Sequence, residues 1–170
     1  SSVNTVTFQS ENGNRNSVTV TSNGATIALQ GTSYLRLKDL TFTSSSPSYV
    51  MTMNGDVSDD SVVGCNITQP INNNSNAAAL AAYSLSGTNS GMVFKDNNFS
   101  GGYYCFYWEG SWSNYTPGLV IDNNTMSQSN FYCTYIAYTE ALKFRNNKVT
   151  GNTSSYYNVY IYDSYNSPEI

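Results

Sequence analysis

The sequence predicts an all-β solenoid of about six coils, and three observations support this fold class. An apolar strand, a polar corner and a second apolar position recur in MVFKDNNFSGG (92–102), LVIDNNTMSQS (119–129) and LKFRNNKVTGN (142–152). The closing apolar residues of successive copies lie 23 to 32 residues apart. No window of roughly twelve residues has helical periodicity. A repeat of this length with variable insertions is typical of stacked coils, each of which is one structural unit.

Each coil begins with two apolar anchors that lie five residues apart and flank the polar corner. The first coil runs from NTVTF (4–8) to TIALQ (26–30) and carries the extra loop SENGNRN (10–16). The later coils pair, in chain order, Leu37 with Phe42, Val62 with Ile67, Phe94 with Phe99, Ile121 with Met126, and Phe144 with Val149.

A further strand is expected after each pair of anchors. These runs are rich in β-branched, aromatic and small apolar residues and are bounded by Gly, Asn or Asp, which is strand composition between turn signals. They cover residues 26–31, 49–55, 78–87, 103–110, 131–138 and 158–163.

The asparagine doublets predict a corner between the first two strands of each coil. Aligning the copies places Leu40, Cys65, Asn97, Asn124 and Asn147 in one column. Equivalent residues of stacked coils lie about 4.8 Å apart, so the three asparagines are expected to form a ladder of side-chain amides. Asn also tolerates the left-handed backbone of a sharp bend, which we expect at this column.

These repeats resemble those of the right-handed parallel β-helix proteins of the pectate-lyase-like superfold. The resemblance covers roughly residues 5–163 and rests on the three copies quoted above. It implies a right-handed parallel β-helix. The superfold includes polysaccharide lyases, glycoside hydrolases, phage tailspikes and adhesins, so the resemblance alone does not select a function.

Composition favours an extracellular or cell-surface protein. The 170 residues are long enough for one β-helix domain over 1–170, which we expect to be a piece or subunit of a larger extracellular assembly. Charged residues make up 11% and the formal net charge is −4. No basic footprint for nucleic acid is evident, and no apolar run is long enough for membrane insertion.

The three cysteines and the absence of histidine restrict the chemistry. Cys65 is expected to be a small buried residue in the corner column. Cys105 and Cys133 occupy similar places in successive coils, as neighbouring thiols or as a disulfide. The chain has no histidine, which removes Ser-His-Asp, Cys-His and His-metal chemistry. No metal and no cofactor is expected.

An enzyme remains the alternative, as a polysaccharide lyase or glycoside hydrolase fragment. Its candidate catalytic residues are the cluster Asp56, Asp59 and Asp60 in NGDVSDDS (54–61), with Lys38 and Lys95 one coil away in register. Paired carboxylates can act as general acid and base. The competing interpretation is a solvated turn, because Asp and Ser bond their own backbone there.

Tyrosines concentrated after residue 100 predict a ligand-binding surface. In NVYIYD (158–163), inward Val159 and Ile161 would leave Tyr160 and Tyr162 outward. Stacked aromatic rings can hold the apolar faces of sugars, although tyrosine also simply suits half-exposed strands. The candidate ligand-binding residues are Tyr107, Trp108, Trp112, Tyr115, Tyr135 and Tyr160.

Two surface signals have less weight. N-glycosylation sequons occur at Asn66, Asn73, Asn98, Asn114, Asn123 and Asn152. Regular Thr-X-Thr rows on a flat solenoid would suggest an ice-binding face, but TVTS (19–22) and TFTS (41–44) are not repeated in the later coils.

The sequence therefore favours a non-catalytic, structural or adhesive extracellular module, such as a segment of a surface fibre. Its expected partners are copies of itself stacked head to tail, or flanking β-helix coils, and glycans. Open first and last coils would favour such stacking, because unpaired strand edges invite pairing.

Overall fold

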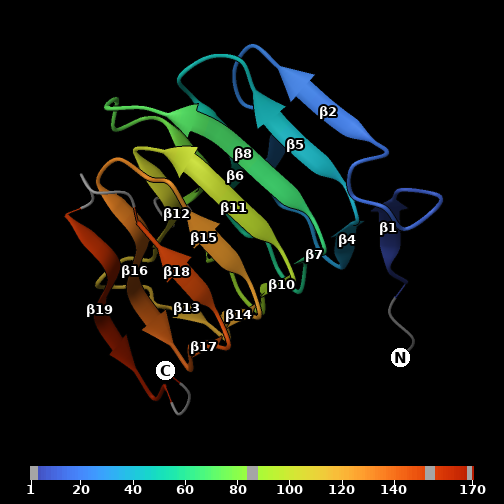
Figure 1. Ribbon diagram of the computed structural model, residues 1–170. Helices are drawn as coiled ribbons and strands as arrows, with labels where there is room; N and C mark the ends of the chain where they lie inside the picture. The colour runs from blue at the N-terminus through green and yellow to red at the C-terminus, as the bar shows by residue number, and fades with distance from the viewer. Residues whose placement is uncertain (1–3, 84–87, 152–155, 168–169) are drawn as a thin grey trace.

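The computed structural model describes residues 4–83, 88–151, 156–167 and 170. In this part of the chain every regular element is a β-strand, and the strands wind into a solenoid of six coils (Figure 1). Each coil contributes one strand to each of three layers of parallel strands, here called face one, face two and face three. Faces two and three belong to one continuous sheet, because Gly102 also pairs with Ala78 between them. The predicted all-β solenoid is confirmed.

Face one contains the first strand of every coil, in the order of the coils. Its inward positions form a column that includes Leu37, Val62, Phe94 and Ile121, all buried. The strands are β1 (Val6–Gln9), β4 (Leu35–Lys38), β7 (Ser61–Val63), β10 (Val93–Lys95), β14 (Val120–Asp122) and β17 (Lys143–Arg145).

Face two follows the corner and is the sheet at the front of Figure 1, from blue β2 to orange β18. Its inward column contains the second anchors Phe42, Ile67, Phe99 and Met126, so the predicted anchor pairs lie together in the core. The strands are β2 (Thr19–Ser22), β5 (Thr41–Ser44), β8 (Asn66–Ile71), β11 (Asn98–Gly102), β15 (Thr125–Ser127) and β18 (Lys148–Thr150).

Face three closes each coil and has the longest strands. A short additional strand, β13 (Thr116–Pro117), pairs with the end of β16. Residues 84–87 of the run predicted over 78–87 lie outside the described residues. The strands are β3 (Ile27–Leu29), β6 (Tyr49–Asn54), β9 (Ala78–Tyr83), β12 (Tyr104–Glu109), β16 (Tyr132–Glu140) and β19 (Tyr157–Tyr165).

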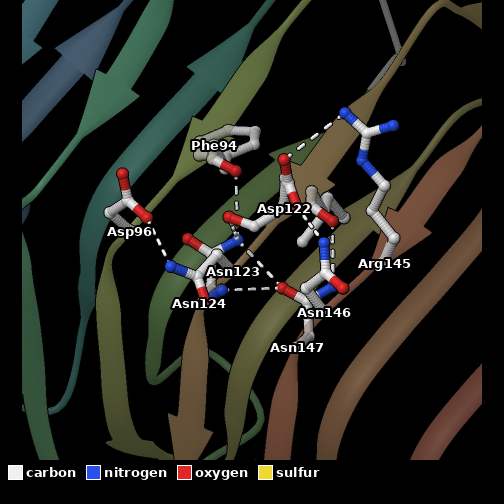
Figure 2. A network of polar contacts seen from close by, with 9 residues as sticks. Phe94, Asp96, Asp122, Asn123, Asn124, Arg145, Asn146 and Asn147 are labelled. Atoms are coloured by element: carbon white, nitrogen blue, oxygen red, sulfur yellow. Dashed lines mark hydrogen bonds and ion pairs between the residues drawn. The ribbon is translucent and has the colours of Figure 1, made fainter.

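The corner between faces one and two is held by a ladder of asparagine side chains (Figure 2). Asn97 Nδ2 donates to Asn124 Oδ1, and Asn124 Nδ2 donates to Asn147 Oδ1, each at 3.0 Å. Each Oδ1 also accepts the main-chain N–H of the preceding coil, from Asn97 at 3.0 Å and from Asn124 at 2.9 Å. Upstream, Asn97 Oδ1 accepts the main-chain N–H of Cys65 at 2.8 Å. The ladder thus provides hydrogen-bond acceptors for main-chain N–H groups at the corner, between the strands.

The left-handed backbone lies one residue before the ladder, not at the ladder asparagines as expected. The residues with positive φ at this corner are Asp39, Gly64, Asp96, Asn123 and Asn146. In the last two doublets the first asparagine, Asn123 or Asn146, makes the bend, and the second turns its amide inward to bond the neighbouring coil. In the fourth coil Asp96 makes the bend, so Asn97 is the ladder residue and Asn98 begins the next strand. The two asparagines of a doublet therefore have different tasks.

Asn123 and Asn146, the first residues of the last two doublets, form a second, outer network at the same corner (Figure 2). Asn123 Nδ2 donates to Asp96 Oδ1 at 2.6 Å, and Asn146 Nδ2 donates to Asp122 Oδ1 at 3.0 Å. The Asn146 bond, followed by the charge of Arg145, lowers the pKa of Asp122.

Candidate functional site

Three ladders of stacked aromatic rings lie on face three, on the last three coils. The first consists of Tyr107, Tyr135 and Tyr160, which are in register at outward positions of β12, β16 and β19. The ring centroids of Tyr107 and Tyr135 are 4.7 Å apart with an interplanar angle of 6°, and those of Tyr135 and Tyr160 are 5.4 Å apart at 15°. The structure thus brings together three of the candidate residues named from the sequence, and their role in ligand binding stays a prediction.

Two further ladders run beside the first. Tyr132 stacks on Tyr104 at 6.1 Å and on Tyr157 at 5.7 Å. Phe131 stacks on Tyr103 at 4.9 Å and on Tyr156 at 5.4 Å. These two ladders were not predicted from the sequence. The signal that would have found them is a shared pattern, two aromatic residues followed by any two residues and Tyr, which starts at 103, 131 and 156.

The ladders begin at the fourth coil because the third coil has alanines at the same positions. On the second coil Tyr49 lies in the column of Tyr104, but Ala78 separates the two. Tyr107 is in register with Ala81 on the third coil, and Tyr104 with Ala78. Both alanines are fully buried. On face three, a coil with alanines at these positions therefore precedes the three coils with aromatic residues.

Stacking leaves the edges of the rings, rather than their faces, for contact with a ligand. Each middle ring has a neighbour on both of its faces, so Tyr132 and Tyr135 offer their rims and hydroxyl groups. At the last coil the described residues add no further ring, and Tyr156 and Tyr157 are 65% and 47% exposed. Within the ladders, sugar rings could therefore stack on aromatic faces only at the C-terminal end. The part of the ladders that can stack on glycans is thus limited to the last coil.

The hydroxyl groups of Tyr104 and Tyr135 stay protonated well into the alkaline range. Burial, followed by the negative charge of Glu109, raises the pKa of Tyr135 to about 12. Burial also raises the pKa of Tyr104 to about 12. Tyr107 donates its hydroxyl hydrogen to Glu109 Oε2 at 2.5 Å. At neutral pH this surface presents phenol hydroxyls, which can donate to or accept from polar ligands.

The insertion after β12 contains two of the candidate ligand-binding residues. Trp112 is 79% exposed at its tip. Tyr115 packs edge-on against Tyr165, with centroids 4.7 Å apart. A hydrogen bond to Asp163, together with desolvation, raises the pKa of Tyr115 to about 12. Tyr115 therefore belongs to a second tyrosine cluster beside the ladders, and Trp112 stands apart from both.

Trp108 requires a correction. It was expected on the aromatic surface, but its side chain is fully buried in the core. Its ring packs edge-on against Phe94 with centroids 5.7 Å apart, and it stacks on Phe106 at 6.4 Å. The reason is strand alternation, because Trp108 has the inward parity of Phe106 and Tyr107 has the outward parity.

The candidate catalytic aspartates occupy a turn and make main-chain contacts. Asp56 and Asp59 both have φ of 54°, and Asp56 Oδ1 accepts the main-chain N–H of Thr88 at 3.1 Å. Asp60 is buried and accepts the N–H of Leu35 at 2.7 Å and the hydroxyl of Thr32. Among the described residues no group of three or more His, Cys, Asp or Glu is arranged to hold a metal ion. These contacts are those of a structural turn.

The cysteines are free thiols and are buried. Cys65 lies in the corner column, and its Sγ lies 3.7 Å from the main-chain oxygen of Leu37. Cys105 and Cys133 are hydrogen-bonded neighbours on β12 and β16; burial raises the pKa of Cys105, whereas the bond from Cys105 lowers that of Cys133. Of the two arrangements left open by the sequence, the structure has the thiol pair.

The sequons fall on different surfaces. Asn66 and Asn98 lie at outward positions of face two, Asn123 lies at the corner, and Asn73 and Asn114 are exposed in insertions. Asn152 lies outside the described residues.

The geometry defines the class of protein as a parallel β-helix. The sequence matches no protein-family model, and no curated protein or solved structure shows significant similarity to it. The described part of the chain contains no helix that is long and apolar enough to cross a membrane.

Proposed function

We propose that this chain is a non-catalytic structural module that stacks end to end with copies of itself, as a segment of an extracellular fibre or surface adhesin of the pectate-lyase-like superfold. The observation that supports this best is the open apolar interior at the first coil. There the described residues leave a cavity of about 380 Å³ between the three faces. Its lining includes Phe8, Val18, Val20, Ile27, Leu35, Leu37, Leu40 and Phe42.

The first coil has exposed apolar side chains and unpaired strand edges on which a further coil could stack. Phe8 has inward parity in register with buried Leu37, yet it is 57% exposed. Among the described residues, the strands β1, β2 and β3 are each paired on one side only. Unpaired strand edges and uncovered apolar side chains together favour the addition of a further coil.

The last coil has the side chains that would continue the register. On β19, Val159, Tyr160 and Ile161 occupy the columns that contain Ile27, Ala28 and Leu29 on β3. Stacking the last coil on the first coil of a second copy would seat Tyr160 beside Ala28. The chain already contains this arrangement, because Tyr107 lies beside Ala81 where the fourth coil meets the third.

An adhesive role is supported by the aromatic part of face three. Phenol hydroxyls in the three ladders can donate hydrogen bonds to sugars, and the exposed ring of Trp112 in the insertion can stack on them. The low content of charged residues, 11%, suits an extracellular surface. Glycan contact is therefore proposed at the ladder rims and at the last coil.

The stacking is tested by measuring mass with light scattering and by negative-stain electron microscopy over a range of concentrations. We expect filaments or end-to-end oligomers of the parent chain. Phe8→Lys should leave monomers, because it places a charge in the junction, whereas Thr7→Lys on the outward side of the same strand should still assemble. A monomeric parent at high concentration would overturn self-stacking and leave flanking coils as the partner.

A further inference from the structure

Face two has two continuous files of hydroxyl and amide side chains on its outer surface. Each of its six strands supplies one outward residue to each file, on either side of an inward apolar residue, which is buried in the four middle coils. The first file is Thr19, Thr41, Asn66, Asn98, Thr125 and Lys148. The second file is Thr21, Thr43, Thr68, Ser100, Ser127 and Thr150.

These files correct the expectation that the Thr-X-Thr pattern stops after the second coil. The pattern continues through every coil in a substituted form: NIT (66–68), NFS (98–100), TMS (125–127) and KVT (148–150). Asn and Ser replace Thr at the same outward positions, and register pairs them with the threonines above and below. The sequence pattern hides the repeat, whereas strand pairing reveals it.

The surface formed by the files is neutral. Lys148, at one end, is the single charged residue among the twelve, and none is aromatic. All twelve side chains are exposed or half-buried. Five of the seven cationic side chains of the protein lie instead at outward positions of face one: Arg36, Lys38, Lys95, Lys143 and Arg145.

The files are also regular and held in place. Neighbouring strands lie about 4.8 Å apart, and the two files, two residues apart along each strand, are separated by roughly 6.6 Å. Asn98 Nδ2 donates to Asn66 Oδ1 at 2.9 Å, and Ser100 Oγ donates to Thr68 Oγ1 at 3.3 Å. The register between coils is continuous over the files; a shift between β8 and β11 occurs only beyond Ser100.

We propose that face two binds ice. A parallel sheet repeats its hydroxyl and methyl groups at a spacing close to that of the oxygen atoms in a plane of hexagonal ice. Such a surface can hold water in a matching arrangement at many points at once, with methyl groups of threonine between the bound waters. The absence of charge in the body of the files suits a neutral, periodic solid.

Other flat partners fit face two less well. Crystalline polysaccharides are held by exposed aromatic platforms, and the aromatic residues lie on face three. Nucleic acids and anionic lipids require clustered cations, and those lie on face one. The loop 10–17 borders the first file, where Thr41 Oγ1 donates to the main-chain oxygen of Arg15 at 2.7 Å, so the second file is the more open of the two.

The inference is independent of the proposed stacking, because a single copy already has both complete files. We would measure thermal hysteresis and partition into a slowly growing ice hemisphere, using the chain produced without glycosylation because Asn66 and Asn98 are sequons on this face. We expect the parent to enter the ice and to separate the melting and freezing temperatures.

Two variants and one matched control test the position of the surface. Thr68→Tyr and Ser127→Lys each break the second file, so ice partition and hysteresis should fall to the level of a non-binding protein. Val63→Tyr places the same ring on face one of the third coil and should change neither. Far-UV circular dichroism checks folding, and either folded file variant is sufficient.

Exclusion of the parent from ice, with no gap between melting and freezing, would overturn the proposal, even if the parent bound crystalline cellulose or chitin instead. Equal loss of activity in Val63→Tyr, or full activity in a folded file variant, would also overturn it.

Discussion

The rings of Tyr107 and Tyr135 are parallel to within 6°, with centroids 4.7 Å apart, although 28 positions separate them in the chain. This separation is that of neighbouring strands in a sheet. The rings therefore stack because their coils stack, and each added ring buries the face of the preceding one. The tyrosines connect consecutive coils on the outside of face three, as the asparagines do at the corner.

Replacing the middle asparagine of the ladder should destabilise the fold. Asn124→Ala removes the acceptor of both the main-chain N–H and the side-chain amide of Asn97, which is 1% exposed. Leaving such buried donors unpaired costs about 1–3 kcal/mol. Urea unfolding of Asn124→Ala should show a loss of this size. Asn98→Ala, at an exposed position beside the ladder, is the control and should change stability much less.

The middle ring of the first tyrosine ladder should contribute to stability through its ring, not its hydroxyl. Tyr135→Ala removes two stacked contacts, each of which is worth about 0.5–1.5 kcal/mol beyond area burial. Tyr135→Phe keeps both contacts and should unfold near the parent. Thermal and urea unfolding of the two variants tests this. Equal loss in both would mean that the hydroxyl, rather than stacking, is the stabilising group.

Glycan binding should be separable from stability at the edge of the aromatic surface. Tyr160→Phe removes a hydroxyl while it keeps the stack on Tyr135, and Trp112→Ala removes an exposed ring from an insertion. We expect both variants to keep the parent's urea midpoint and to bind more weakly on a glycan array. Unchanged binding in both variants would remove these residues from the proposed surface.

Stability should decrease at strongly alkaline pH. The pKa values of Tyr104 and Tyr135 are raised from 10.0 to about 12 in the folded protein, chiefly by burial. The folded state therefore holds more protons than the unfolded chain between these values, so the stability is complete below pH 10 and falls as pH rises through about 12. Unfolding midpoints measured across this range should fall less steeply in a Tyr104→Phe, Tyr135→Phe double variant.

The glycine pair that ends β11 should not tolerate a side chain. Gly101 has φ of +86°, and a β-carbon there would collide with the main-chain oxygen and carbon of Gln69 on the preceding coil. We expect Gly101→Ala to cost about 4 kcal/mol or more, because neither backbone can move independently. Gly31→Ala is the matched control, since φ is +60° there and no atom lies within 4 Å of the added carbon. It should show the cost of the backbone conformation alone.

Much of the coil could be predicted from the sequence because its corners are locally encoded. The five-residue spacing of Phe94 and Phe99 around a doublet repeats with few exceptions, and it determines which residues point inward. Which asparagine of a doublet makes the bend and which bonds the neighbouring coil could not be predicted, because both Asn123 and Asn124 are the same residue type. The sequence shows the residue type but not which amide turns towards the next coil.

The incorrect predictions concern surfaces that form only when the coils stack on one another. Trp108 was grouped with its tyrosine neighbours by proximity in sequence, although alternation along the strand separates Trp108 from Tyr107. The files of face two are not evident in the sequence, because Asn66 and Ser100 occupy outward positions that are threonine in the first two coils. Such equivalences depend on which residues pair between coils, and insertions of unequal length conceal that pairing in the sequence.

Strand pairing continues through all six coils on each of the three faces, with a register shift between β8 and β11 beyond Ser100, while the outward residues differ in chemistry from face to face. Duplication or deletion of one of the last three coils would therefore lengthen or shorten the hydroxyl and aromatic surfaces together, each by one residue per column. Substitutions within a coil can alter one surface alone, because each face takes its outward residues from its own strand. The molecule thus has a modular length and three independently variable sides, so an ancestral coil could multiply first and diversify face by face afterwards.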